Sequence, residues 1–536
     1  MNQKIEEIQK ESEELLNSIH LDENYSKNKV FNTEILLNQI SSFMTFEEIK
    51  IFFSVNKKLN TLFRKSINKI KTKKLITTPE ILSRFPNLKT IKLSWGLSVN
   101  LDFLSKSYSK NLENIVLEGD KYENIELIGN LTELKTLILT GNKITNISFI
   151  KNLNKLSLLD LGNNKIKDLT PLANLTSLKT LSLQECNVTN LNILKLQNFQ
   201  KLEKLCIGQN NIIDYSFLAN LVNLKALNVY QSKITSFDFI NMLNPDKLEE
   251  LNLGENKIED YSPLFKLKKL KILNLYHNNI TEIYFMANKC FHNLEELNLG
   301  NNKINDFSPL KNLSKIKTLT LYSCSLTNAY FLENSNFYEL EYLNLGNNEI
   351  DDCSFLSFFT NLKVLNMTNN KITNFYWLNK CKCADKIVEF IFGQNPIESI
   401  EFLSNLKNLK KLNLFDCGLK DISFLKEKCF ANLILLNLGK NKIYDASPVF
   451  NLKKLKNLNL SSNLIRNLDF LDLNNSDIID LNLSGNLIND FKPLLKLDKL
   501  EYINISNQIK IINGEELEEF SSVIEQIKKN VLKFKD

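Results

Sequence analysis

An eleven-residue pattern, L-x-x-L-x-L-x-x-N-x-I, recurs through most of this 536-residue chain. The segments LKTLILTGNKI (134–144) and LEELNLGENKI (248–258) are two of its copies. A single coil with this pattern cannot bury its own apolar face, so neighbouring coils must stack on one another. The pattern therefore predicts a repeat array instead of one compact core. Its copies begin at Leu88, Leu112, Leu134, Leu156, Leu178, Leu202, Leu224, Leu248, Leu270, Leu294, Ile316, Leu340, Leu362, Ile387, Leu409, Leu433, Leu455, Ile478 and Leu500.

Each copy predicts one short strand with its leucines facing inward, followed by a bend. We expect the asparagine at the ninth position to hydrogen-bond backbone groups at that bend, which would otherwise be buried without partners. The short return segments, such as DYSPL (260–264), leave room only for a turn or a 3₁₀ helix. Cysteine or serine replaces the asparagine in four of the copies, and we expect it to act as a structural turn residue: Cys186, Ser232, Cys324 and Cys417.

With this pattern and spacing, the chain resembles the leucine-rich-repeat family, and within it the internalin-like class of 22-residue repeats, over residues 88–510. The resemblance implies an α/β solenoid, an arc of about 19 repeats that we place at residues 76–510. Residues 511–536 carry apolar side chains at helical spacing and predict a capping helix over the last coil. These side chains are Leu517, Phe520, Ile524, Ile527, Val531 and Phe534.

The first 87 residues lack the repeat. We predict an amphipathic helix in residues 1–30 and a small bundle of three short helices in residues 31–75. The second segment resembles an F-box through Glu34, Ile35, Leu36, Ile40, Phe43, Ile49, Val55 and Lys57. It departs from that pattern at Asn32, Asn56 and Leu59, where the family usually has proline, cysteine and tryptophan.

F-boxes dock a Skp-type adaptor, so this resemblance implies an adaptor-binding surface in the N-terminal head. The residues that it places there are Phe31, Ile35, Leu36, Ile40, Phe43 and Met44. The alternative is that residues 31–87 are only the N-terminal cap that a solenoid needs.

The concave face of the array is the predicted partner-binding surface. Its fifth position is often asparagine, as at Asn228 and Asn274, and we expect these amides to hydrogen-bond along their own column, as stacked asparagines do. Gripping an extended peptide is the alternative role. The seventh position alternates glycine with an aromatic ring, at Tyr230, Tyr276, Tyr322 and Phe415. These rings either lie across the neighbouring glycines or form a row of anchors for a partner.

Several functional classes lack support in the sequence. The three histidines form no H-x-x-x-H pair and lie near no cysteine cluster, and neither a phosphate-binding loop nor a dinucleotide fingerprint is present. We therefore assign no catalytic residue, metal or cofactor. A net charge of +6 is small for this length and does not indicate nucleic-acid binding. Without a secretory signal or an apolar run of about 18 residues, we expect no membrane association and nine reduced cysteines in an intracellular protein.

These patterns predict an intracellular adaptor, cytoplasmic or nuclear. By the F-box resemblance its head joins a cullin-type ubiquitin ligase, and its solenoid presents an unidentified protein substrate. Two alternatives remain: a binding scaffold whose head is only a cap, and an internalin-like, host-directed binding protein.

Overall fold

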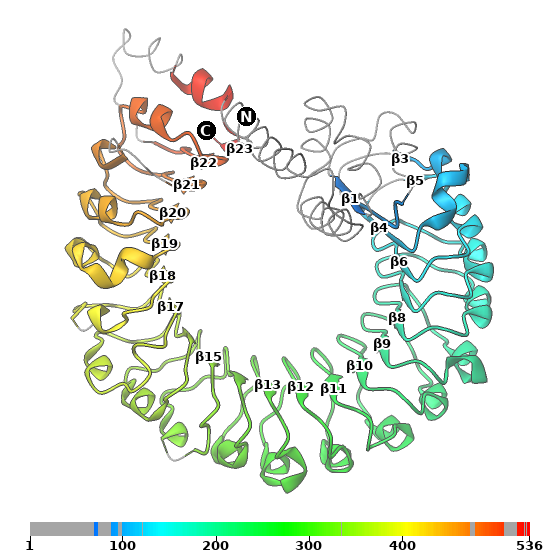
Figure 1. Cartoon of the computed structure of the whole chain (residues 1–536). Coiled ribbons are helices and arrows are strands. Elements are labelled where there is room, and N and C mark those ends of the chain that lie inside the picture. Colours follow the sequence, from blue (N-terminus) through cyan, green and yellow to red (C-terminus); the bar gives the residue numbers. More distant parts are fainter. Residues whose placement is uncertain are drawn as a thin grey trace, which may run out of the picture. The chain divides into compact units, whose positions relative to one another are not determined.

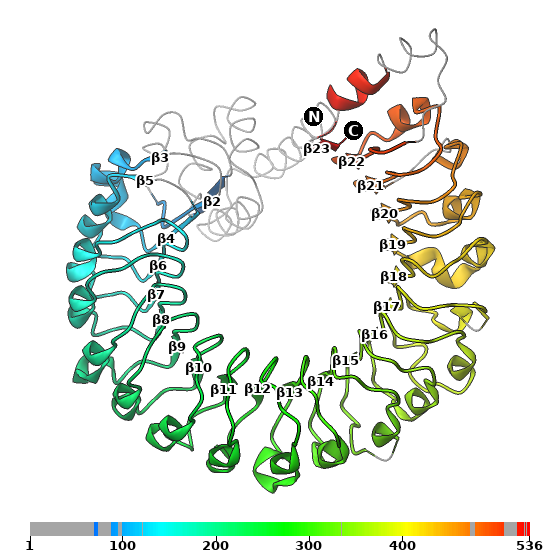
Figure 2. The ribbon, with the colours of Figure 1, turned by 180° about the vertical axis from the view of Figure 1, so that it is seen from behind.

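The computed structural model describes residues 69–72, 87–94, 99–119, 122–333, 335–401, 403–471, 477–508, 523–529, 531 and 533–535. The chain divides into two compact units, Met1–Leu264 and Phe265–Asp536, and both are built from the same coil. Each predicted repeat contributes one short strand, so that strands β2, β4 and β6 through β22 correspond to the 19 copies of the pattern. The strands line one side of each coil and the 3₁₀ helices line the other (Figure 1, Figure 2). The predicted leucine-rich-repeat solenoid is confirmed.

The first unit holds a ladder of parallel strands in which leucine pairs with leucine from coil to coil. For example, Leu227 pairs with Leu205 on one side and with Leu251 on the other. A separate pair is formed by β3 (Val99–Asn100) and β5 (Tyr122–Glu123). The ladder consists of β1 (Lys69–Thr72), β2 (Thr90–Ser94), β4 (Asn114–Glu118), β6 (Thr136–Ile138), β7 (Leu158–Asp160), β8 (Thr180–Ser182), β9 (Lys204–Cys206), β10 (Ala226–Asn228) and β11 (Glu250–Asn252).

The second unit repeats this arrangement. Leu297 pairs with Leu273 and Leu319 in the same register. Its parallel strands are β12 (Ile272–Asn274), β13 (Glu296–Asn298), β14 (Thr318–Thr320), β15 (Tyr342–Asn344), β16 (Val364–Asn366), β17 (Glu389–Ile391), β18 (Lys411–Asn413), β19 (Leu435–Asn437), β20 (Asn457–Asn459), β21 (Asp480–Asn482), β22 (Tyr502–Asn504) and β23 (Lys533–Lys535).

The return segments form 3₁₀ helices, as predicted from their length. In the first unit they are η2 (Asp102–Ser105), η3 (Ser107–Asn111), η4 (Ile125–Asn130), η5 (Ser148–Asn152), η6 (Thr170–Asn174), η7 (Asn192–Lys195), η8 (Gln197–Phe199), η9 (Ser216–Asn220) and η10 (Asp238–Met242), and the division between the units falls within η11 (Ser262–Lys266). In the second unit they are η12 (Tyr284–Ala287), η13 (Lys289–Phe291), η14 (Ser308–Asn312), η15 (Tyr330–Leu332), η16 (Ser354–Phe358), η17 (Tyr376–Asn379), η18 (Leu403–Asn405), η19 (Ser423–Lys426), η20 (Lys428–Asn432), η21 (Ser447–Asn451), η22 (Asp469–Leu471) and η23 (Lys492–Lys496).

The core lies between the strands and the returns. In one coil Leu294, Leu297 and Leu299 have exposed fractions of 0, 1 and 0%. An aspartate begins many of the returns and fixes the first turn: Asp306 Oδ1 accepts a hydrogen bond from the Ser308 amide at 2.8 Å. Since burial of a leucine side chain stabilises by about 1.5–3 kcal/mol, the stacked leucines are the main favourable contribution to folding.

The ninth-position asparagines join each coil to the coil before it, as the sequence predicts. Asn302 Oδ1 accepts hydrogen bonds from the backbone amides of Asn278 and Ile280, at 2.9 and 3.0 Å. Its Nδ2 donates to the carbonyl oxygens of Leu275 and Leu299, at 2.9 and 2.8 Å. One side chain thus satisfies backbone groups of two coils inside a buried spine.

Cysteine replaces this asparagine with part of the same bonding. The Cys324 thiol donates to the carbonyl oxygen of Leu299 at 3.4 Å, and its own amide is held by Asn348 of the next coil. Cys186 and Cys417 make the equivalent contacts. The predicted structural role of these three cysteines is confirmed.

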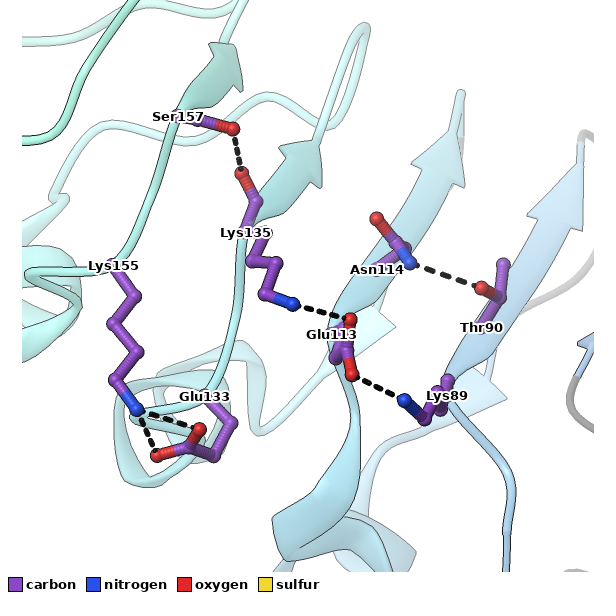
Figure 3. A network of polar contacts seen from close by, with 8 residues as sticks. All are labelled: Lys89, Thr90, Glu113, Asn114, Glu133, Lys135, Lys155 and Ser157. Carbon is purple, nitrogen blue, oxygen red and sulfur yellow. Dashed lines mark hydrogen bonds and ion pairs between the residues drawn. The ribbon is translucent and has the colours of Figure 1, made fainter.

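Charged residues beside the strands alternate between lysine and glutamate along the first coils (Figure 3). Glu113 lies between Lys89 and Lys135, and each ammonium is 2.7 Å from one carboxylate oxygen. Lys155 reaches both oxygens of Glu133 at 2.7 Å. These pairs bridge neighbouring coils at the exposed margin of the sheet.

Two predicted boundaries need correction. In the described part of the chain the first strand of the ladder is β1, Lys69–Thr72, which lies inside the segment assigned to the helical head. This strand joins the sheet by backbone pairing and does not need the leucine pattern. At the other end, the described helix covers only 523–529, where Val523, Ile524 and Ile527 are buried. The chain then forms β23, in which Phe534 pairs with Ile503, so the capping helix does not reach residue 536. The described helices include none that is long and apolar enough for a membrane span.

Candidate binding surface

The strand side of each unit carries the aromatic residues that the sequence singles out. Tyr230 follows β10 in the first unit, and Tyr276, Tyr322 and Phe415 follow β12, β14 and β18 in the second. Tyr230, Tyr276 and Phe415 are half-buried, whereas Tyr322 is exposed, at 39%. All four occupy the seventh position of their coils.

Three of these rings lie against a glycine of the following coil. A methyl group added at Gly254 would come within 3.1 Å of Tyr230 Cδ2. The same addition at Gly300 would lie 3.4 Å from Tyr276 Cδ2, and at Gly439 it would lie 3.0 Å from Phe415 Cδ2. The glycines therefore make room for flat rings, as one of the two sequence-based interpretations proposes. Because the three residues are only half-buried, part of each side chain remains at the surface.

The fifth-position asparagines do not pair along their column, contrary to our expectation. Each side-chain oxygen instead accepts a hydrogen bond from the backbone amide two residues later, as Asn228 does from Tyr230 and Asn274 from Tyr276, both at 2.9 Å. The short asparagine side chain reaches this amide within its own coil, which is an Asx turn. In the described part of the chain this bond recurs at Asn252, Asn298, Asn344, Asn366, Asn413, Asn437, Asn459, Asn482 and Asn504.

Side chains of neighbouring coils do form a ladder of hydrogen bonds, but these side chains occupy the eighth position of each repeat. Gln209 Nε2 donates to Gln231 Oε1 at 2.9 Å, and Asn347 Nδ2 donates to Ser323 Oγ at 3.0 Å. These residues have φ values between 50° and 58°, the left-handed region in which asparagine is favoured among side-chain-bearing residues. This backbone conformation directs their side chains toward the neighbouring coils. The sequence pattern alone does not reveal this orientation.

The structure also brings together the thiols of two cysteines that are two residues apart in the sequence. Cys381 Sγ and Cys383 Sγ lie 2.9 Å apart beside η17. The hydrogen bond from Cys383 lowers the pKa of the Cys381 thiol, and the same contact together with burial raises the pKa of Cys383. Within the described ranges, no group of three or more His, Cys, Asp or Glu residues is arranged to hold a metal ion.

A hollow of about 1150 Å³ on the return side of the second unit was not anticipated from the sequence. Three exposed rings contribute to its wall: Tyr330 (49%), Phe358 (54%) and Tyr376 (54%). Asp352 accepts a hydrogen bond from the Tyr330 hydroxyl at 3.2 Å. Aromatic residues in three successive returns, in η15, η16 and η17, were the available sequence signal.

The predicted adaptor-binding residues lie outside the described residues. They are Phe31, Ile35, Leu36, Ile40, Phe43 and Met44.

Comparison with known proteins agrees with the fold. The family model described as "Leucine Rich repeats (2 copies)" matches residues 132–174, 246–288 and 339–380. No curated protein sequence matches the chain. Among solved structures, the TLR13–ssRNA13 complex is similar at 22% identity, covering 81% of this chain and 68% of that one, with a TM-score of 0.51.

Two bacterial structures are also similar in sequence pattern. An internalin (inlF) from Listeria monocytogenes is 26% identical over 76% of this chain and 93% of its own, with a TM-score of 0.30. A leucine-rich-repeat protein from Leptospira interrogans is 22% identical over 80% of this chain and 100% of its own, with a TM-score of 0.46. The fold and the repeat thus define a leucine-rich-repeat solenoid.

Proposed function

We propose that this chain is a scaffold that binds another protein through the strand side of its repeats. The observation that carries the proposal is the exposed ring of Tyr322, which lies in one column with Tyr276 and Phe415. Aromatic side chains are favoured as anchors at protein interfaces because they bury much area at a small entropic cost. The strand side presents such rings at intervals along a rigid sheet.

The test replaces Tyr276, Tyr322 and Phe415 with serine in the full chain. A matched control replaces three exposed tyrosines of the return segments, Tyr284 (65%), Tyr338 (68%) and Tyr444 (69%), with serine. Partners captured from the native source are compared by mass spectrometry for the two variants and the unaltered chain. We expect the first variant to lose a partner that the control retains. Equal capture by both variants would refute a binding role for the strand side.

For the N-terminal head we propose a second role, the docking of a Skp-type adaptor of a cullin-type ubiquitin ligase. The order of an F-box-like segment followed by leucine-rich repeats supports this proposal. In this role the chain works inside a cell and presents its bound protein as a substrate. Changing Ile35 and Leu36 to aspartate in the full chain should abolish adaptor binding and leave the circular dichroism of the repeats unchanged.

The outcome also separates the alternatives. If the unaltered chain binds no Skp-type adaptor, the head is a cap and the scaffold role stands alone. A partner captured only from a host organism would instead favour the internalin-like, host-directed role.

A further inference from the structure

We propose that the strand side of the second unit binds a proline-rich partner segment in the polyproline II conformation. This inference rests on the proposed scaffold function and specifies the chemistry of the partner. Its elements are the fifth-position asparagines that lie between the first and the last ring, the rings of Tyr276, Tyr322 and Phe415, and the spacing of the strands that carry them. These asparagines are Asn298, Asn344, Asn366 and Asn413.

The asparagines present hydrogen-bond donors that the fold itself does not use. In each, the atom facing the backbone amide must be the oxygen, because an amide N–H cannot bond to another donor. The Nδ2 group is therefore the free end of the side chain. In the described part of the second unit, Nδ2 has no partner at Asn298, Asn344, Asn366 or Asn413, all half-buried.

The chain itself indicates that the fold does not need this donor. In the first unit Asp160 occupies the fifth position, and its Oδ1 accepts the Gly162 amide at 2.8 Å. A carboxylate thus makes the same turn without an N–H group. Ile391 occupies the position in the second unit without any acceptor. The repeated amides therefore provide donors beyond the structural requirement.

The seventh position adds flat aromatic surfaces next to these donors. Tyr276 and Phe415 lie against Gly300 and Gly439, and Tyr322 is 39% exposed. Polyproline II segments dock on aromatic surfaces of this kind, where the preformed helix loses little entropy on binding. Proline rings pack on the ring faces while the ligand carbonyl groups point to neighbouring donors.

The spacing of the coils matches this conformation. Tyr276 and Tyr322 follow strands that are two steps apart in the ladder, β12 and β14, with β13 between them. Two steps of about 4.8 Å give about 9.6 Å. Three residues of polyproline II advance about 9.3 Å, one full turn. Phe415 follows β18, four further steps along, or about six ligand residues. Ligand residues i, i+3 and i+9 then face the three rings.

The polarity of the surface also favours proline. The fifth and seventh positions from Asn274 to Ser461 carry no charged side chain. Proline has no backbone N–H, so a proline-rich segment offers carbonyl acceptors and no competing donors. A segment with ordinary residues would bring its own N–H groups against the asparagine donors. Among the charged residues of the flanking third position, Glu389 and Lys411 form an ion pair at 2.8 Å.

The experiment uses the full chain and fluorescein-labelled twelve-residue peptides, one of proline and one of alternating glycine and serine. Fluorescence anisotropy measures their affinities. The test variant carries Asn298→Asp, Asn344→Asp and Asn366→Asp, which keeps the turn oxygen and removes the donor. The control variant carries Asn437→Asp, Asn482→Asp and Asn504→Asp, which makes the same charge change beyond the ring positions. Melting temperatures of both variants verify that they fold.

We expect the proline peptide to bind the unaltered chain and the control variant equally. Because the test variant loses three hydrogen bonds to the peptide, it should bind at least about tenfold more weakly. The glycine–serine peptide should not bind. The inference is overturned if the proline peptide does not bind the unaltered chain. It is also overturned if the peptide binds the test variant as tightly as the unaltered chain.

A neutral oligosaccharide serves as the competing probe, since amides and aromatic rings also suit sugars. Its binding in place of the proline peptide would overturn the proline assignment. The scaffold function fails separately, when replacement of the three rings with serine leaves partner capture intact.

Discussion

The Lys135 ammonium lies 2.7 Å from one carboxylate oxygen of Glu113 across neighbouring coils, while Lys89 holds the other oxygen at the same distance. Hydrogen bonds from Lys135 and Lys89 lower the pKa of Glu113 from its usual 4.5 to about 2. A carboxyl group whose pKa is lower in the folded state contributes stability that is complete above the unfolded value and disappears as the pH falls through the folded value.

We therefore predict that Glu113→Gln removes a stabilisation that is present at neutral pH and fades between about pH 4.5 and pH 2. Urea titrations of the variant and the unaltered chain at several pH values measure the difference. Since the lysines are exposed, the difference should shrink as salt is added. A difference that persists unchanged at pH 2 would contradict the ion-pair explanation.

Replacing Leu297 with alanine should destabilise the second unit by about 2–5 kcal/mol, because the change leaves a cavity among packed leucines. Leu297 is 1% exposed and pairs with Leu273 and Leu319. Hydrogen exchange should accelerate first in these neighbouring coils, since each repeat contacts only its neighbours. Leu464→Ala, at a side chain that is 47% exposed, provides the control and should have little effect.

The variant Gly439→Ala tests whether the Phe415 ring packs against this glycine. The added methyl group would lie 2.8 Å from Ser461 Oγ and 3.0 Å from Phe415 Cδ2, closer than normal contact. We expect a loss of about 1–3 kcal/mol from overpacking. Combining it with Phe415→Ala relieves one of the two clashes, so the double variant should lose less than the sum of the single variants. Strict additivity would show that the ring and the glycine do not interact.

Asn302→Ala leaves two buried backbone amides and the Leu275 carbonyl group without the partner that Asn302 provides, while the Leu299 carbonyl group keeps its hydrogen bond from the Cys324 thiol. Each unsatisfied buried group costs about 1–3 kcal/mol, so this variant should be among the least stable single changes in the spine. Asn302→Cys should cost less, because Cys324 already donates to a carbonyl in the same position of the next coil. Thermal unfolding of both variants measures which of them is more stable. An equal loss of stability in the two variants would contradict this prediction.

The repeat pattern predicted most of the fold because each coil must bury the same apolar positions and satisfy the same backbone groups at its bend. Leucines at fixed positions set the strands, and asparagine at the ninth position sets the spine. The ends were less predictable. Lys69–Thr72 joins the sheet by backbone bonds, and residues 533–535 pair with Tyr502–Asn504, although neither segment carries the leucine pattern.

The candidate surface was predicted only in outline. The sequence located the columns of Tyr276 and Asn274, yet it could not decide which partner each side chain takes. The asparagine oxygen bonds to its own coil, whereas left-handed residues such as Gln209 form the ladder between coils. Backbone dihedral angles decide this difference, and one-letter spacing does not record them. The head stays a prediction from sequence.

The three cysteines that replace ninth-position asparagines can report local opening of the coils in which they lie. Cys186 lies in the first unit, and Cys324 and Cys417 lie in separate coils of the second. Burial raises the pKa of each thiol to about 11, so alkylating reagents can reach a reactive thiolate only after a coil loosens. The rate at which each cysteine is labelled thus gives the opening frequency of its own coil, without any introduced probe.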